Sequence, residues 1–526
     1  MYRQRLSRFS PMLFVGVACA TMVFLACCAA MLLSAGGDGQ TRAVARQRLP
    51  ISRHSSGEGV RKTTATDRSI APEIDRQIDG GINRVIDAEI SRVIGGEINR
   101  VFAGEINRVI DPEVDPYLPA FDRGPRAGYL DMDDTALPDA DYMEKLYWWQ
   151  GWERFRQKLS LQSGLGPSFN GRSCAECHAH PSMGGSSPME NPYTRIARET
   201  GNGNQLPSFA RGATVVARFI RRADGSPDGA VHNVFVITGG LDSGAAHNCT
   251  IEQPDFARAI RENNIAYRQV TPVFGAGLIE NITEGEIIRN KDTDAPRKEL
   301  LGISGRANRD ERGRITRFGW KAQQSLETFT GDAMVTEMGQ TNALFPHERT
   351  SNIACRAASE LDDRPPGDGN DAWSLNDLQA LIVFQRFLAP PAPAAPTPVT
   401  ESGRLLFEKI GCALCHTPTL KTGSSSSLSL DNKAVNLYSD LLVHDMGETL
   451  ADGITQGLAS PREFRTAPLW GLGRRLWFLH DGRTDDLVTA IGLHASPGSE
   501  ANTVVENFRK LPAKEQQALL DFLRSL

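Results

Sequence analysis

Two stretches near the end of the chain carry apolar residues at the spacing of an amphipathic helix. Residues 374–388 begin with a serine that can cap a helix, and apolar positions then recur three and four residues apart. Residues 512–526 repeat this pattern, with proline in the first helical turn. Both stretches contain Gln-Ala-Leu followed shortly by Phe. Because a similar helix closes each of two segments, we interpret the segments as an internal duplication.

The pattern also indicates domain boundaries and a fold class. Residues 390–399 are rich in proline and predict a stiff linker between a first domain, 117–389, and a second, 400–526. Alternating apolar residues at 213–220 and 231–237 predict a small β-hairpin insertion in the first domain. The expected fold is therefore mainly α, with two domains and one hairpin.

The N-terminal 116 residues differ in pattern from the rest. Basic residues and then an apolar run predict a signal peptide or a membrane anchor over residues 1–35, and both alternatives stay open. Residues 36–70 are polar and predict a disordered tether. Residues 71–116 repeat every eight residues, with too many glycines for one continuous helix, and predict a spacer of short helical turns. Because the basic flank stays in the cytoplasm, we expect the bulk of the chain outside it, in the periplasm or an equivalent compartment.

Composition limits the partners. The 526 residues carry a net charge of -5 and no long basic run, so we expect no nucleic-acid partner. A weakly acidic surface suits small molecules or a redox partner protein. Of the nine cysteines, Cys249 and Cys355 lie outside both the N-terminal apolar run and the paired motifs described next. In an oxidising compartment they are candidates for a disulfide, and two separate thiols are the alternative.

Two Cys-x-x-Cys-His motifs carry the clearest chemistry. They comprise Cys174, Cys177 and His178 in the first domain, and Cys412, Cys415 and His416 in the second. In this motif the thiols add to the vinyl groups of a haem, and the histidine binds the iron. A zinc site would need a further cysteine pair, which neither domain has at the required spacing. The sequence therefore predicts two covalently bound haem c groups, with the two histidines as proximal iron ligands.

The second axial ligand of each iron does not follow from residue types. Histidine binds iron strongly, whereas methionine raises the potential. The candidates are Met183, His247, Met338 and His347 in the first domain, and His444, Met446, His480 and His494 in the second.

Several segments, in order along the chain, resemble a known family. They are Arg317-Phe-Gly-Trp-Lys-Ala, Glu337-Met-Gly-Gln-Thr, His444-Asp-Met-Gly, Arg465-Thr-Ala-Pro-Leu-Trp-Gly-Leu-Gly and Phe478-Leu-His-Asp-Gly-Arg. Over roughly residues 145–526 the chain resembles the dihaem oxidoreductases, peroxidase-like proteins also called thiol oxidoreductases. These are related to the bacterial dihaem cytochrome c peroxidases and MauG. The resemblance implies two cytochrome c-like domains that face each other.

The resemblance also implies roles for single residues of the second domain. In this superfamily the residue fourteen positions after the His of His-Asp-Gly binds the second haem iron. That position is His494 here, and Met446 is the alternative. His480 and Arg483 would then lie toward the first domain as catalytic candidates. The family usually continues with His-Gly-Gly-Glu-Ala after the ligand, whereas this chain has three more residues before Glu500.

Peroxidase chemistry at the first haem needs an open or displaceable iron position and a nearby group that moves a proton. Met338 is the candidate distal ligand, and Glu337 is a candidate acid. Trp320 is a candidate for the pocket or the electron path, and an ordinary core residue is the alternative.

The leading hypothesis is an exported dihaem cytochrome c that acts as a peroxidase-like oxidoreductase. It would take electrons from a redox partner protein at one haem and pass them to the other, where a small oxidant such as hydrogen peroxide is reduced. Two alternatives stay open. One is an electron carrier with both irons six-coordinate, and the other is an oxidase of a sulfur compound or a partner protein.

Overall fold

The structure is a computed structural model, and it describes only part of the chain. The described residues are 136–160, 163–166, 169–188, 215–221, 225, 256–347, 363 and 375–526. All of them lie in one compact unit, Gly104–Leu526. The predicted N-terminal segments, 1–35, 36–70 and 71–116, and the disulfide candidates Cys249 and Cys355 lie outside the described residues. Among those described, no helix has the length and apolar character needed to cross a membrane.

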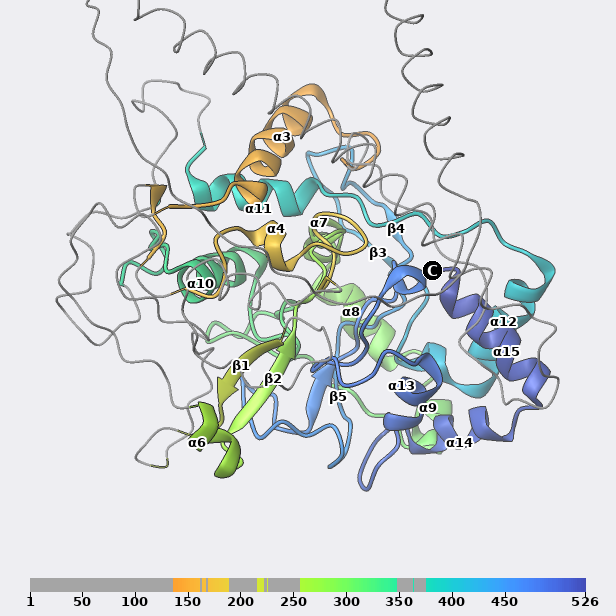
Figure 1. The fold of residues 1–526 in the computed structure, drawn as a ribbon. Helices are drawn as coiled ribbons and strands as arrows, with labels where there is room; N and C mark the ends of the chain where they lie inside the picture. Colours follow the sequence, from red (N-terminus) through yellow and green to blue (C-terminus); the bar gives the residue numbers. More distant parts are fainter. Residues whose placement is uncertain are drawn as a thin grey trace, which may run out of the picture. The chain divides into compact units, whose positions relative to one another are not determined.

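The described part is mainly helical, as the sequence predicts (Figure 1). The helices are α3 (Tyr142–Arg156), α4 (Cys174–Cys177), α6 (Phe256–Arg261), α7 (Ala276–Asn281), α8 (Glu284–Asp292), α9 (Ala295–Leu301), α10 (Leu326–Met338), α11 (Asp377–Phe387), α12 (Pro398–Ile410), α13 (Leu487–Leu493), α14 (Asn502–Lys510) and α15 (Ala513–Arg524). Two short 3-10 helices are η3 (Cys412–Leu414) and η4 (Leu472–Arg474).

Three small antiparallel sheets of two strands each complete the described elements. They pair β1 (Val215–Phe219) with β2 (Ile265–Gln269), β3 (Leu420–Lys421) with β4 (Ala434–Val435), and β5 (Val443–Asp445) with β6 (Glu463–Arg465). The first predicted hairpin strand is therefore present, but its described partner is β2. The second predicted strand, 231–237, lies outside the described residues.

Both helices predicted from the apolar pattern are present as α11 and α15. Helix α11 begins later than predicted, because Asn376 rather than Ser374 caps it and forms a capping box with Gln379. Helix α15 follows Pro512, as predicted. The structure thus confirms the two helices and corrects one of their starting points.

Each of these helices packs on the helix that precedes a Cys-x-x-Cys-His motif. Helix α11 packs on α3, and α15 packs on α12 (Figure 1). Both crossings are so close that a Cβ on Gly151 of α3 would collide with the backbone of Ala380, and one on Gly403 of α12 with that of Ala518. The two alanines belong to the two Gln-Ala-Leu sequences. The internal duplication predicted from sequence therefore has a matching pair of helix crossings.

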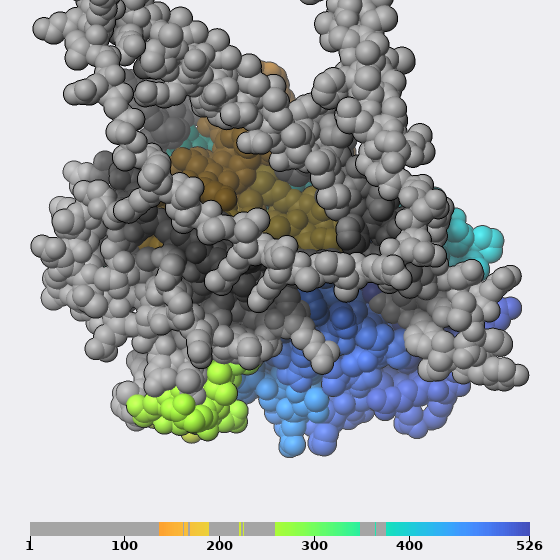
Figure 2. All heavy atoms as spheres, viewed as in Figure 1, coloured from red at the N-terminus to blue at the C-terminus, as the bar shows by residue number. Residues whose placement is uncertain are grey.

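Two clusters of buried apolar residues form the main cores. The larger includes Phe155, Phe384 and Leu388 together with Leu437 and Trp470, so it contains residues from both sides of the proline-rich segment 390–399. The smaller is built from α12, α13, α14 and α15 and the loops between them. Figure 2 shows C-terminal residues, in blue, as a continuous part of the visible surface beside the residues around α6, in green.

The predicted boundaries between the first domain, the linker and the second domain stay a prediction.

Candidate functional site

Both Cys-x-x-Cys-His motifs fold into the same tight turn. The backbone N–H of His178 donates to the carbonyl of Cys174, and that of His416 to the carbonyl of Cys412, each at 2.9 Å. These bonds place the first cysteine and the histidine of each motif on one face. The cysteine and histidine side chains of each motif also line one cavity. This is the arrangement that haem attachment requires.

The two motif histidines are prepared as metal ligands in the same way. Nδ1 of His178 lies 3.2 Å from the carbonyl oxygen of Gly185, and Nδ1 of His416 lies 3.0 Å from that of Tyr438. Because a carbonyl oxygen only accepts, Nδ1 of each ring carries the hydrogen, which leaves the Nε2 lone pair of His416 free, whereas the carbonyl of Thr271 also acts on the ring of His178. Burial lowers the pKa of each imidazole to about 4. Both rings are therefore neutral near pH 7, the form that binds iron.

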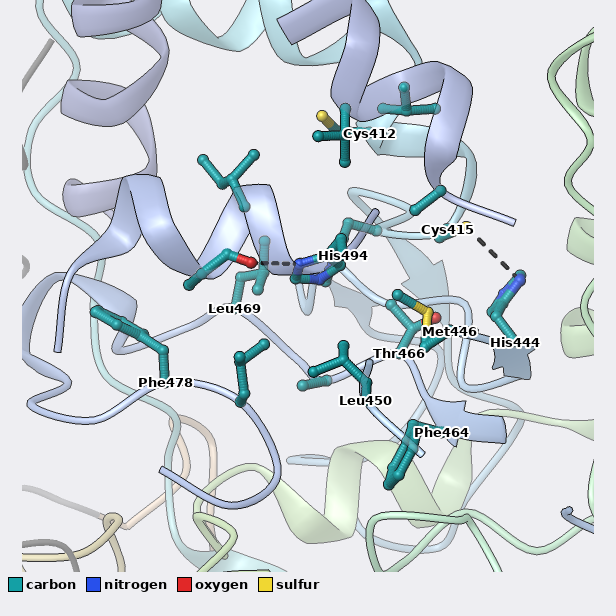
Figure 3. Close-up of a pocket in the computed structure, with 18 of the residues that line it drawn as sticks. Cys412, Cys415, His444, Met446, Leu450, Phe464, Thr466, Leu469, Phe478 and His494 are labelled. Atoms are coloured by element: carbon teal, nitrogen blue, oxygen red, sulfur yellow. Dashed lines mark hydrogen bonds between the residues drawn. The ribbon is translucent and has the colours of Figure 1, made fainter. Parts of the chain in front are cut away.

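A cavity of about 220 Å³ adjoins the second motif, and its walls are mostly apolar (Figure 3). Cys412, Cys415 and His416 line it, together with Met446 and His494. His494 follows the end of α13, and its Nδ1 donates to the carbonyl of Ala490 at 2.7 Å, which leaves Nε2 available. The ligand that the resemblance implies, His494, and its alternative, Met446, therefore both lie in this cavity, and so do the other two candidates of the second domain, His444 and His480.

Two arginines in the same cavity test whether a haem fits there. Arg465 and Arg475 both line it, and burial lowers the pKa of each guanidinium to about 10. The charge of Arg475 lowers the pKa of Arg465 further, and Nε of Arg465 is buried without a hydrogen-bond partner among the described residues. Two neighbouring cations, of which Arg465 is buried and Arg475 partly buried, call for an anion. The propionates of a haem are such anions, and an apolar cavity of this size is too large for a close-packed interior, so the residues fit the group.

Another cavity, of about 140 Å³, adjoins the first motif. We call it the first cavity and the one beside the second motif the second cavity. Cys174, Cys177 and His178 line it, and His178 is the only histidine among its described lining residues. Met338 and Glu337, both from the last turn of α10, lie in its wall. Of the other candidates in this domain, Met183 packs against the larger core, His347 is exposed, and His247 lies outside the described residues. The two cavities thus differ in the ligands that they offer.

Carboxylate and amide side chains in the wall of the first cavity can accept or donate hydrogen bonds. Nδ2 of Asn170 donates to Oε2 of Glu337 at 2.7 Å, which orients that carboxylate. The amide groups of Gln323 and Gln385 also line the cavity. Oε1 of Gln323 is buried and has no hydrogen-bond partner within the described part of the chain. The cavity wall therefore combines an oriented carboxylate with an unpaired amide oxygen.

Trp320 lies in the wall of both cavities and of a smaller one that shares residues with each. Its Nε1 donates to the carbonyl of Gln269 at 2.7 Å, and the N–H of Gln269 donates to the carbonyl of His480, also at 2.7 Å. The rings of Trp320 and His480 meet edge to face, with 6.4 Å between centroids. Trp320 is thus fixed where the two cavities come together.

The two catalytic candidates of the second domain lie in different surroundings. His480 is buried, lines the second motif's cavity and stacks on Phe464 with 4.2 Å between centroids. Burial and the nearby charges of Arg268 and Arg483 hold its pKa well below the usual value. Arg483 pairs with Asp481 at 2.6 Å, and it is not among the described lining residues of either haem cavity. The structure brings His480, but not Arg483, to a cavity.

Two buried charge clusters were not found from sequence. In one, Asp452 pairs with Arg268 and with Lys321, whose ammonium also donates to the backbone carbonyls of Ser460 and Glu463. In the other, His444 lies between Asp440 and Glu500. Both nitrogens of His444, which was also a candidate distal ligand, are engaged by carboxylates. No local pattern marks either cluster, although the Glu of the family's His-Gly-Gly-Glu-Ala sequence was a signal for Glu500.

Comparison with known proteins places the chain in a family. Residues 219–526, more than half of the chain, match the model of the family described as "Di-haem oxidoreductase, putative peroxidase". The match begins after the first Cys-x-x-Cys-His motif, so it is narrower than the resemblance expected from residue 145 onward. No curated protein matches the chain in sequence.

Solved structures give only distant likenesses. They include hydrazine synthase of Kuenenia stuttgartiensis, at 13% identity and a TM-score of 0.32 over 79% of this chain and 100% of that one. The diheme peroxidase BthA of Burkholderia thailandensis has 15% identity and a TM-score of 0.29, over 78% of this chain and 92% of that one. A MauG-like protein associated with microbial copper homeostasis has 17% identity and a TM-score of 0.23, over 47% of this chain and 89% of that one. Because these TM-scores are below 0.5, the solved structures add nothing to the family match. The family match alone shows that the chain belongs to the dihaem oxidoreductase family and is a haem-based, peroxidase-like oxidoreductase with two haems.

Proposed function

We propose that this chain is an exported dihaem cytochrome c that reduces a small oxidant, such as hydrogen peroxide, at the haem of the first motif. Electrons would enter from a redox partner protein at the haem of the second motif. The observation that carries the proposal is the difference between the two cavities. His416 and His494 both line the cavity of the second motif, whereas His178 has no second histidine among the described lining residues of its cavity.

This difference assigns a role to each site. Bound haem supplies one-electron transfer and, where an axial position of the iron is open, the reduction of peroxide. In the cavity of the second motif, His416 and His494 would both hold the iron, which suits electron transfer without reaction. In the cavity of the first motif, His178 would hold the iron without a second histidine among the described lining residues, and Met338 is a weaker ligand there. Covalent attachment through the four motif cysteines would fix both groups in place.

The residues of the first cavity would handle the protons of the reaction. Reduction of hydrogen peroxide to two waters consumes two electrons and two protons. Glu337 is a carboxylate in the cavity wall, oriented by Asn170, and it can take a proton from bound peroxide and return it to the departing oxygen. The unpaired Oε1 of Gln323 can accept a hydrogen bond from the substrate. These contacts favour a small, hydrogen-bonding oxidant.

Trp320 would lie on the electron path between the two sites. Its ring lines both cavities, and its Nε1 hydrogen bond to Gln269 holds it there. An aromatic ring between two redox groups shortens the distance that an electron must cross through saturated bonds. The basic residues and apolar run of the first 35 residues support export, with either a cleaved signal or a retained anchor.

One observation favours the electron-carrier alternative. Met338 lines the first cavity, and methionine is a known sixth ligand of haem iron in electron carriers. A carrier would have two low-spin haems in every redox state and would not react with peroxide.

Electron paramagnetic resonance of the purified, haem-loaded protein separates these two functions. After partial reduction the haem that has taken up an electron is silent, and we expect the haem that stays ferric to give a high-spin signal. We also expect fast consumption of peroxide when a reduced cytochrome is supplied. Only low-spin signals, in the oxidised and the partly reduced protein alike, together with no peroxide consumption, would refute the proposed peroxidase function and support the carrier.

A further inference from the structure

Three buried charged side chains lie beside the second haem-attachment motif. Asp440 follows the motif, His444 lies in β5, and Glu500 precedes α14; together they form what we call the His444 cluster. Nδ1 of His444 lies 2.7 Å from Oε2 of Glu500, and Nε2 lies 2.9 Å from Oδ2 of Asp440. Ionised carboxylates only accept hydrogen bonds, so both ring nitrogens carry a hydrogen. His444 is therefore an imidazolium between two carboxylates.

The His444 cluster is rigid and shielded from solvent. The side chains of Asp440, His444 and Glu500 are 1%, 4% and 14% exposed. Glu500 also accepts hydrogen bonds from the N–H and the hydroxyl of Ser304, at 2.9 and 2.8 Å, and from the N–H of Gly305 at 3.1 Å. Gly305 has a φ of 62°, and a Cβ there would lie 2.5 Å from Cε1 of His444. Charges held in this way are only weakly screened.

This cluster touches the point where the second haem would be attached. Nδ1 of His444 lies 3.7 Å from Sγ of Cys415 (Figure 3). His444 and Glu500 also line the cavity that His416 and His494 share. In the haem-bound protein that sulfur would be a neutral thioether, so the imidazolium would be a positive charge in direct contact with the attachment point.

We propose that the His444 cluster sets the reduction potential of the second haem. Reduction adds one electron, and a buried positive charge beside the attachment point stabilises that electron, whereas the two carboxylates oppose it. His444 would thus be a positioning and tuning residue rather than a catalytic one. The inference rests on the proposed haem attachment at Cys415. It deepens the proposed function, because the second haem must accept electrons from a partner and release them to the first.

Removing a positive or a negative charge from the cluster should shift the reduction potential of the second haem in opposite directions. Replacing His444 by Gln removes the positive charge and leaves two carboxylates, so the potential of the second haem should fall. Replacing Glu500 by Gln removes a negative charge, so the potential should rise. We expect a change in the reduction equilibrium of about tenfold in each case, or about 59 mV for one electron. A purely structural role would move both variants the same way, because loosening the site admits water in both.

The measurement is an optical redox titration of the full-length, haem-loaded protein. Electron paramagnetic resonance of the oxidised variants checks that the ligands of the second haem are unchanged, and the potential of the first haem is an internal reference. Asp445→Asn is the matched control. Asp445 adjoins His444 in the sequence, but it is 34% exposed and paired with Arg462 at 3.0 Å, so its loss should change the potential little.

The outcomes separate this inference from the function on which it rests. Shifts of opposite sign in the two variants support it, and unchanged potentials or shifts of the same sign overturn it. If the His444→Gln protein does not bind haem, Asp440→Asn takes its place and should raise the potential as Glu500→Gln does, and for this pair a fall or no change in the potential overturns the inference. A wild-type protein that carries both haems but does not reduce peroxide would refute the peroxidase function and leave this test intact. Absence of covalent haem at Cys415 would overturn both.

Discussion

At the residue scale, the histidines of the two motifs are alike and their surroundings differ. Each donates its Nδ1 hydrogen to a backbone carbonyl, which fixes the ring. The difference lies across each cavity, where His494 faces the second site and α10 supplies Met338 and Glu337 to the first. The residues around the histidines, rather than the motifs themselves, therefore distinguish the roles of the two sites.

Replacing His494 by Ala should change the spectrum of one haem only. If His494 binds the second iron, its loss opens the sixth position and converts that haem from low to high spin. Met446→Leu is the matched control, since Met446 lines the same cavity and its loss should leave both signals unchanged. Electron paramagnetic resonance of the oxidised protein measures this. A spectral change in Met446→Leu but not in His494→Ala would reverse the ligand assignment.

Replacing Glu337 by Gln should lower kcat for peroxide reduction by about 10²- to 10³-fold, because the amide cannot move the proton. The spectra of both haems should be retained, since Glu337 binds no iron. Glu327→Gln is the control, because Glu327 lies on the same helix but is exposed, and kcat should stay at the wild-type value. A Glu337→Gln enzyme of normal kcat would show that another group moves the proton.

At the scale of elements, the molecule uses the same helix pair twice. Helix α3 crosses α11, and α12 crosses α15, and in each pair a glycine lets the backbones meet at the alanine of Gln-Ala-Leu. The helices that precede the motifs are thereby held against the helices that close each segment. This contact positions each attachment turn next to its cavity.

Replacing Gly403 by Ala should lower the free energy of unfolding by about 1–3 kcal/mol, because the new methyl group meets the backbone of Ala518. Gly492→Ala is the matched control. Gly492 is also helical, in α13, but the nearest atom to a Cβ there is the end of the Arg509 side chain at 3.8 Å. That substitution should be neutral or slightly stabilising. Equal destabilisation in both variants, measured by urea unfolding, would contradict the close crossing.

At the scale of the whole described unit, the two cavities meet at Trp320. Its ring lines both, and its hydrogen bond to Gln269 ties it to the strand that also contacts His480 through the backbone. The larger core contains residues from both sides of the proline-rich segment. The two sites are therefore parts of one packed structure, as the proposed electron transfer between them would require.

Replacing Trp320 by Leu should slow electron transfer between the haems without changing their ligands. The leucine removes the aromatic ring that both cavities share. Stopped-flow spectroscopy can follow reoxidation of the second haem after peroxide is mixed with the fully reduced protein. Trp149→Leu is the control, because Trp149 is 52% exposed on α3 and lines neither cavity. Identical rates in the two variants would remove Trp320 from the electron path.

Much of the site follows from sequence, for a local reason. A Cys-x-x-Cys-His motif forms its own turn, so the residues that would hold each haem could be identified without knowing the fold. Likewise, the spacing of apolar residues predicted α11 and α15, because the buried face of a helix carries apolar residues every three to four positions. The strand partner of β1 could not be predicted in this way, since strand pairing depends on segments distant in the chain.

The sequence by itself determined the two Cys-x-x-Cys-His motifs, the mainly helical fold, the duplicated closing helices and the family resemblance that pointed to His494. Only the tertiary structure decided which candidates share a cavity. It placed Trp320 in both cavities, moved Arg483 to a surface ion pair and enclosed His444 between Asp440 and Glu500. The physical reason is that short-range patterns fix turns and helices. Cavities and buried charges, in contrast, arise only when segments that are far apart in the chain pack against each other.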